Sequence, residues 1–302
     1  MTAVDLGAAA PRAEGRAIRQ VVLAALGFSL IPIFTVIATQ RGTPLTIILA
    51  GRYAVAALAL LPAIGWLRRN PLPKGRLVPL VVIGASGQAL VAALSLSALA
   101  WIPAATLVFL FYTFPAWVTL ISAVRGLEPL DRRRLVALAM SFAGLALLVG
   151  WPGTAGVHPI GVGLALAAAV GYAAYVPVMG HLQRGIDASL TTLVIALGAV
   201  LIFVVAAMLR SELAWPNHGA SWGAIAGLGL ISTVIAFRLF FVGLAALGPV
   251  RTSIVSTVEP LFAAAFAAIL LDQPVTLPIV AGGALILSAV VGLQLGAASR
   301  GP

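Results

Sequence analysis

Charged residues are scarce in this chain of 302 residues. Asp, Glu, Lys and Arg together make up 9% of the sequence, whereas 62% of the residues are apolar. Soluble globular proteins carry about 25% charged and about 45–50% apolar residues. The composition therefore argues against a soluble enzyme, a nucleic-acid-binding protein or a disordered chain, and it predicts an integral membrane protein.

Cysteine is absent altogether, which excludes disulfides, thiolate metal sites and cysteine nucleophiles. The three histidines, His158, His181 and His218, lie in predicted loops or at a helix end and give no set of metal ligands. The sequence also lacks a G-x-x-x-x-G-K-[ST] phosphate-binding loop. We therefore predict no catalytic residues, no cofactor and no metal site.

The chain contains several long apolar runs with few or no charged residues. A spanning helix needs about 20 mostly apolar residues, so the uncharged stretch 77–124 is too long for one span and is expected to turn back at Trp101-Ile102-Pro103. The stretch 220–271 is expected to turn at Gly248-Pro249 by the same argument. Ten spans are predicted with these divisions, at 18–40, 43–67, 77–100, 102–124, 133–150, 159–182, 188–209, 220–245, 248–271 and 275–297.

Basic residues are divided unevenly between the loops. With the N-terminus inside, thirteen of the 18 Lys and Arg lie on the cytoplasmic side, and only Arg41 and Arg210 lie on the other. Cytoplasmic loops collect Lys and Arg, so the net charge of +10 follows from topology and requires no nucleic acid. Both termini are predicted to be cytoplasmic, with residues 1–17 and 298–302 as tails. The first twenty residues contain no apolar run, so no cleaved signal peptide is predicted.

The two halves of the chain share a pattern of prolines. An offset of 145 residues aligns Pro32 with Pro177, Pro115 with Pro260, and Pro129 with Pro274. Each half, 18–150 and 159–297, would hold five spans, and this odd number requires the second half to be inverted relative to the first. Inverted repeats are typical of transporters that open a midplane site alternately to the two sides.

Four of these prolines are expected to act as hinges. Pro32, Pro115, Pro177 and Pro260 fall within predicted spans, where proline removes a helix hydrogen bond and produces a kink. The sequence therefore predicts an alternating-access transporter whose kinked spans move around a central cavity.

Two segments carry a resemblance to a known family. They run from Tyr112-Thr113-Phe114-Pro115 to Gly126-Leu127-Glu128-Pro129, and from Ser256-Thr257-Val258-Glu259-Pro260 to Leu271-Asp272-Gln273-Pro274. The chain resembles the drug/metabolite transporter superfamily in its ten-helix EamA-type branch, with the aromatic amino-acid exporters as the suggested members. The resemblance implies an all-α membrane fold of two inverted five-helix EamA-like repeats, transport rather than enzyme activity, and export of small metabolites, often amino acids. One departure is Gln273, which aligns with Glu128, so that the acid shifts to Asp272.

Glu259 is the acidic residue expected at the centre of a span, directly before Pro260. On a helix, Thr252, Ser256 and Glu259 share one face, whereas the equivalent positions of the first half are apolar. Desolvation disfavours the charged form of a carboxyl group, so Glu259 could bind a substrate ammonium or a coupling proton. Alternatively, it satisfies backbone groups freed by the Pro260 kink.

The other candidate substrate-binding residues are cationic, aromatic or polar. Arg238 and Arg52 could each hold a carboxylate or could extend to the headgroups. The resemblance implies a cavity lined by the first, third, fourth, sixth, eighth and ninth helices, which favours Arg238. Rings could stack an aromatic substrate or a cation, or only pack between helices, and small polar residues could line the path or join helices. These remaining candidates are Phe28, Trp101, Tyr112, Tyr175, Gln88 and Ser256.

The leading hypothesis is a secondary active transporter that exports small metabolites, with aromatic or hydrophobic amino acids as the favoured substrates. A multidrug exporter of lipophilic cations is the alternative, although the first span lacks the acidic residue on which the small multidrug exporters of the superfamily depend. A channel or facilitator is a third hypothesis. We expect a multi-pass protein of the bacterial inner membrane that acts as a monomer or weak homodimer on a small-molecule substrate.

Overall fold

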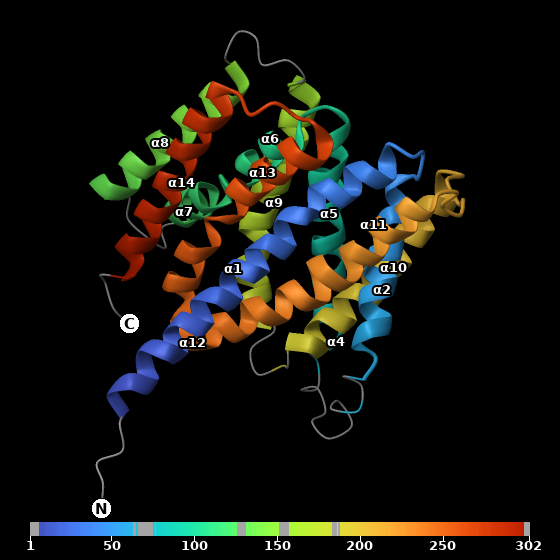
Figure 1. Cartoon of the computed structure of the whole chain (residues 1–302), viewed down its shortest axis with the longest axis horizontal. Helices are drawn as coiled ribbons and strands as arrows, with labels where there is room; N and C mark the ends of the chain where they lie inside the picture. The colour runs from blue at the N-terminus through green and yellow to red at the C-terminus, as the bar shows by residue number, and fades with distance from the viewer. Residues whose placement is uncertain are drawn as a thin grey trace, which may run out of the picture.

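The computed structural model describes residues 6–62, 65, 75, 77–125, 131–150, 157–182, 186 and 188–298. Within these ranges the chain forms helices and connecting loops and no strand (Figure 1). Six helices are long and apolar enough to cross a membrane, and four shorter apolar helices accompany them. The all-α membrane fold is therefore confirmed, with helices in the order that the ten predicted spans require.

The first half provides five helical segments, three of them unbroken. They are α1 (Leu6–Thr39), α2 (Leu45–Leu60), a third span built of α4 (Leu77–Pro79), η1 (Leu80–Ala85) and α5 (Ser86–Ser97), a fourth built of α6 (Ala104–Phe111) and α7 (Phe114–Val124), and α8 (Arg132–Gly150). A short 3-10 turn, η2 (Ala98–Ala100), ends the third span. The chain then leaves helical geometry at Trp101-Ile102-Pro103, where the turn was predicted. Helix α1 begins at Leu6, so part of the expected N-terminal tail is helical.

The second half repeats this order. Its elements are α9 (Pro159–Leu182), α10 (Ala188–Leu209), α11 (Gly219–Gly229), η3 (Leu230–Ile235), α12 (Ala236–Ser256), α13 (Glu259–Leu271) and α14 (Leu277–Ala298). The turn expected at Gly248-Pro249 is not marked by a break in helical geometry, because α12 keeps helical geometry through this pair. The φ angle that proline imposes is compatible with a helix. Figure 1 shows the chain reversing direction at the far end of the long arm of α12 and running back toward α13. The non-helical step at Thr257-Val258 comes after this reversal, within the ninth span.

The two halves are interleaved in space. Helix α1 packs along α12 and α13 of the second half, whereas α9 packs on α5, α6 and α7 of the first. Helix α2 lies against α10, and α8 lies beside α14, as Figure 1 shows. In this last pair the backbones approach so closely that a Cβ atom on Gly144 would lie 2.6 Å from the carbonyl oxygen of Gly282. Neither half therefore forms a separate body.

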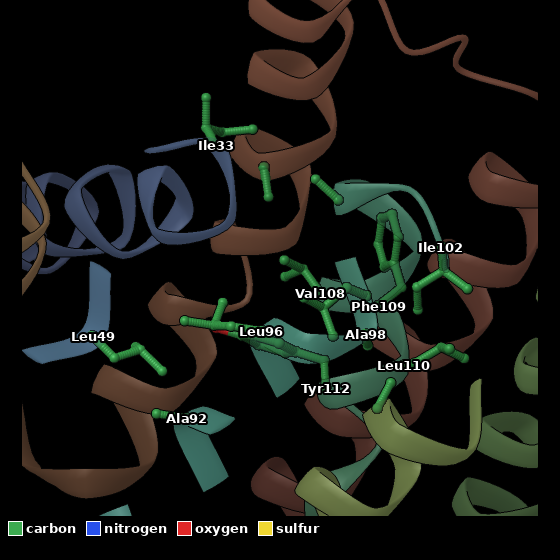
Figure 2. Packing of buried hydrophobic residues seen from close by; sticks show 14 of the residues in the cluster. Ile33, Leu49, Ala92, Leu96, Ala98, Ile102, Val108, Phe109, Leu110 and Tyr112 are labelled. Atoms are coloured by element: carbon green, nitrogen blue, oxygen red, sulfur yellow. The ribbon is translucent and has the colours of Figure 1, made fainter. Parts of the chain in front are cut away.

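Helix α6 lies at the centre of the main hydrophobic cluster. Every residue from Ala104 to Leu110 is buried, and Figure 2 shows Val108, Phe109 and Leu110 in the middle of the cluster. A residue of the second half caps the N-terminus of this helix. The Gln273 side-chain oxygen accepts a hydrogen bond from the backbone N–H of Ala104 at 2.9 Å. Gln273 is the residue that departs from the family motif, and it supplies one of the partners that a helix N-terminus lacks.

The fourth and ninth spans are both interrupted, at positions 145 residues apart. Helix α7 begins with Phe114-Pro115 after a turn at Tyr112-Thr113, and α13 begins with Glu259-Pro260 after a turn at Thr257-Val258. Proline is favoured in a first helical turn, where its missing N–H costs no hydrogen bond. The other two candidate hinges, Pro32 and Pro177, lie inside helices that continue through them. The Gly126–Pro129 part of the motif lies outside the described residues, as do residues 1–5 and 299–302 of the tails.

Candidate functional site

A cavity of about 300 Å³ lies among helices of both halves. Its walls come from α1, α2, α5, α6, α7, α9, α12, α13 and α14. The lining is largely apolar and aromatic, with a few polar groups at defined points. Small-molecule sites in proteins have this composition and a volume of about 300–1,000 Å³, so the cavity has room for one compact molecule.

Glu259 supplies a carboxyl group to this cavity. The hydroxyl oxygen of Tyr112 lies 2.9 Å from Glu259 Oε2 and 3.1 Å from the backbone carbonyl oxygen of Ser256. That carbonyl lies four residues before Pro260, which has no N–H to donate to it. Because the Tyr112 hydroxyl carries a single proton, the carboxyl group and the free carbonyl compete for it.

Aromatic rings line the same cavity as the carboxyl group. The ring of Tyr172 lies 5.0 Å from that of Phe114 and 5.2 Å from that of Phe111, measured between centroids. A second group of rings joins α1 to α12, with Phe28 at 5.0 Å from Phe237. Such separations are typical of favourable aromatic pairs, and both groups belong to the apolar lining of the cavity.

Arg52 supplies the cation of the cavity wall. Its side chain is only 4% exposed, and its Nε–H donates to the Thr233 hydroxyl oxygen at 3.0 Å. The Thr233 hydroxyl donates in turn to the carbonyl oxygen of Leu228 at 2.8 Å. The guanidinium carbon also lies 5.3 Å from the centroid of the Tyr53 ring, within the range of a cation–π contact.

The structure brings most of the predicted residues together. Those that line the cavity are Phe28, Pro32, Gln88, Tyr112, Ser256 and Glu259. Three of the candidate substrate-binding residues do not line it. Trp101 is 41% exposed at the turn before α6, beside the His158 ring. Tyr175 donates its hydroxyl to the carbonyl oxygen of Gly84 at 3.0 Å. Arg238 is exposed on α12.

The structure places Arg52 on the cavity wall and Arg238 outside it, which is the reverse of the expectation that favoured Arg238. Phe237 of α12 lines the cavity, and successive helical residues point about 100° apart, so the neighbouring Arg238 side chain turns away from it. Helix α2 lies against η3, which places Arg52 on the cavity wall although the second span was expected to lie outside it. Phe237 and Phe240 were not singled out as substrate-binding residues. The one signal for Phe237 is its spacing from Thr233 on one helical face, and Thr233 is one of the small polar residues expected to line the path or to join helices.

Comparison with known proteins agrees with this architecture. The EamA-like transporter family matches residues 16–150 and 159–295, as two repeats that together cover nearly the whole chain. The chain belongs to the EamA-like transporter family. This EamA protein is therefore a membrane transporter of small molecules and not an enzyme.

Solved structures support the fold of this EamA protein. One, described as "Crystal structure of protein", is similar with a TM-score of 0.65 and 21% sequence identity over 95% of this chain and 99% of that chain. At this identity the likeness concerns the fold alone. A search of curated protein sequences finds no match.

Proposed function

We propose that this EamA transporter exports amino acids, with aromatic or hydrophobic side chains favoured, by alternating access around the central cavity. The observation that carries the proposal is the aromatic lining around Glu259. A carboxylate and ring faces both attract an ammonium group, and the apolar remainder suits a hydrophobic side chain. The volume of about 300 Å³ favours one amino acid over a large multi-ring drug.

Glu259 is also the proposed proton carrier, with Tyr112 as its partner. When Glu259 is ionised, the Tyr112 hydroxyl donates to its Oε2 atom. When Glu259 is protonated, the carboxyl O–H can donate to the Tyr112 oxygen instead, and the Tyr112 proton is free for the Ser256 carbonyl. Protonation would thus move one hydrogen bond from the carboxyl group to the broken helix backbone. Tyr172 and Arg52 are the other titratable groups on the wall of this cavity.

Alternating access would use the contacts between the halves. Helices α1 and α9 each pack against the broken span of the opposite half. The interruptions at Tyr112-Thr113 and Thr257-Val258 are the points where these spans bend most easily, because fewer helical hydrogen bonds must break there. Inverted repeats allow the same motion to open either side in turn.

Transport by reconstituted protein tests the proposal. We expect vesicles containing the protein to accumulate radiolabelled phenylalanine when a pH gradient is imposed, and excess methyl viologen to compete weakly. Accumulation of methyl viologen with no transport of amino acids would support the multidrug alternative. Ion conductance without accumulation of either compound would support a channel.

We further propose the bacterial inner membrane as the location of the protein and a monomer or weak homodimer as its working form. The family membership supports a multi-pass membrane protein. Membrane fractionation and the molecular mass in detergent at several protein concentrations test these two points. A stable oligomer at all concentrations would contradict the second.

A further inference from the structure

Arg52 is a buried cation whose charge is not balanced by an acid in the described part of the chain. It is 4% exposed, and its contacts there are the Thr233 hydroxyl and the Tyr53 ring. No Asp or Glu of the described residues forms an ion pair with it. A buried charge without a counter-ion is strongly unfavourable, so a protein retains one where a ligand supplies the opposite charge.

The guanidinium is held in a fixed orientation. Its Nε–H donates a hydrogen bond to the Thr233 hydroxyl oxygen. Thr233 lies in the π-helical turn η3, and its hydroxyl donates to the Leu228 carbonyl oxygen. Single π-helical turns within α-helices occur frequently at functional sites. The Tyr53 ring beside the guanidinium is stacked on Phe203 at 6.0 Å, and its hydroxyl oxygen accepts a hydrogen bond from Gln88 Nε2 at 3.2 Å. Arg52 is therefore positioned before any ligand arrives.

The donors that remain suit a carboxylate. Arginine has five N–H donors in a planar fork, and the bond to Thr233 uses the one on Nε. The four donors on the two Nη atoms are left, on a residue that lines the cavity. Planar forks bind carboxylates through two parallel hydrogen bonds, and a carboxylate carries the one negative charge that a single guanidinium balances.

We propose that Arg52 binds the carboxylate of the transported molecule and so selects carboxylate-bearing substrates over lipophilic cations. The inference rests on the proposed transport of small amphiphilic molecules through this cavity. Phe237 follows Thr233 by four residues, on the same helical face, and its ring contacts Phe28. A molecule anchored at Arg52 would therefore place its apolar body against these rings, whereas a cation would be repelled by the guanidinium.

Binding of matched probes tests the role of Arg52. The purified full chain in lipid nanodiscs is titrated with phenylalanine, with 3-phenylpropionate, which lacks the amine, and with phenethylamine, which lacks the carboxylate. A second series uses leucine, isocaproate and isoamylamine. We expect the wild-type protein to bind the carboxylate-bearing members of a series about 10- to 100-fold more tightly than the amine. Hydrogen bonds to charged groups contribute a free energy that corresponds to this ratio of affinities.

The variant Arg52→Gln should lose this preference. Affinity for the amino acid and the acid should fall about 10- to 100-fold, while affinity for the amine is unchanged or increased. Arg238→Gln is the matched control, because it removes an exposed arginine outside the cavity, and it should bind all probes as the wild type does. Arg52→Lys keeps the charge without the fork and should retain part of the preference.

Three outcomes would overturn the inference. The first is equal binding of acid and amine by the wild-type protein, which needs no variant and so holds even if Arg52→Gln does not fold. The second is a folded Arg52→Gln protein that keeps the preference for carboxylates. The third is a wild-type protein that binds neither series, and this result alone would also remove the proposed function.

Discussion

The two interrupted spans have the same backbone design but different chemistry. In the first half, the Leu110 carbonyl accepts a hydrogen bond from the Thr113 hydroxyl at 2.6 Å, within the same interruption. In the second half, the Ser256 carbonyl is reached by the Tyr112 hydroxyl, which belongs to the other half of the chain. The hydroxyl at the first interruption therefore bonds within its own span, whereas the carbonyl that Pro260 leaves without an N–H partner receives a hydrogen bond from a residue 144 positions away.

A change of side-chain type directly before the proline accompanies this difference. The residue before the proline is Phe114 in the first half and Glu259 in the second. Phe114 packs its ring against Tyr172, so it forms part of the cavity lining. Glu259 brings an ionisable group to the equivalent position. The interruption thus occurs in both repeats, and in the second an ionisable side chain stands directly before the proline.

The largest effect is expected from Glu259→Gln, which removes the ionisable group and keeps a similar shape. A pH gradient of one unit stores about 1.4 kcal/mol per proton, enough for about tenfold accumulation of substrate if one proton is exchanged. We expect the variant to accumulate substrate to a ratio of about 1, while exchange of labelled for unlabelled substrate continues. Accumulation ratios in vesicles at a series of pH gradients give the measurement.

Phe114→Leu is the control for that experiment, because it alters the equivalent residue of the first half without touching an ionisable group. Its accumulation ratio should follow the pH gradient as in the wild type. A Glu259→Gln protein that still accumulates substrate would show that the difference between the two interruptions has no part in energy coupling. The role of Glu259 would then be limited to satisfying the backbone groups freed by Pro260.

Tyr112→Phe is expected to have the next largest effect. It removes the hydroxyl that Glu259 and the Ser256 carbonyl share, at a cost of about 1.5–3 kcal/mol for a hydrogen bond to a charged group. The initial rate of gradient-driven transport should fall about tenfold or more, and the pH at half-maximal rate should shift. Tyr175→Phe is the matched control, since that hydroxyl bonds to the Gly84 carbonyl outside the cavity lining. Equal rates for the two variants would contradict the shared-proton arrangement.

The positions of the interruptions could be predicted because they depend on local chemistry. Pro115 and Pro260 lack an N–H wherever they stand, and the offset of 145 residues identified them as equivalent. Pro32 and Pro177 show the same alignment, yet their helices continue through them. A proline removes one helical hydrogen bond, but the packing of neighbouring residues decides whether the helix is interrupted at that point.

The direction of side chains could not be predicted in the same way. A helix that is apolar all round has no polar stripe that would distinguish its inner face from its outer face, so periodicity does not distinguish Arg52 from Arg238, and the family resemblance favoured Arg238. The contact of α2 with η3 is what places Arg52 on the cavity wall. Tyr112 and Glu259 were each identified separately, but their pairing is a contact between residues 147 positions apart, which periodicity cannot show.

A smaller and asymmetric effect is expected from replacing the two prolines. Pro260→Ala supplies an N–H that can bond to the Ser256 carbonyl and so compete with Tyr112, whereas the N–H that Pro115→Ala supplies faces the Phe111 carbonyl and leaves the Tyr112 hydrogen bonds in place. We expect Pro260→Ala to slow transport a few-fold more than Pro115→Ala. Restoring a helical hydrogen bond should stabilise the protein by about 1 kcal/mol. Transport rates together with thermal unfolding of the two variants measure this, and equal loss in both would indicate that only the bend matters.

The smallest effect on transport is expected from Thr113→Val. Thr113 is buried, its hydroxyl donates to the Leu110 carbonyl, and its oxygen accepts a hydrogen bond from Trp117 Nε1 at 3.2 Å. Valine has nearly the same shape and leaves the Trp117 Nε1–H without this acceptor, while the Leu110 carbonyl keeps the hydrogen bond from the backbone N–H of residue 113 at 3.2 Å. The loss should lower the free energy of unfolding by about 1–3 kcal/mol. None of these groups lines the cavity or contacts Glu259, so the pH dependence of transport should stay unchanged. If Thr113→Val altered that pH dependence as Tyr112→Phe does, the first interruption would take part in proton coupling, and the two halves would be functionally equivalent after all.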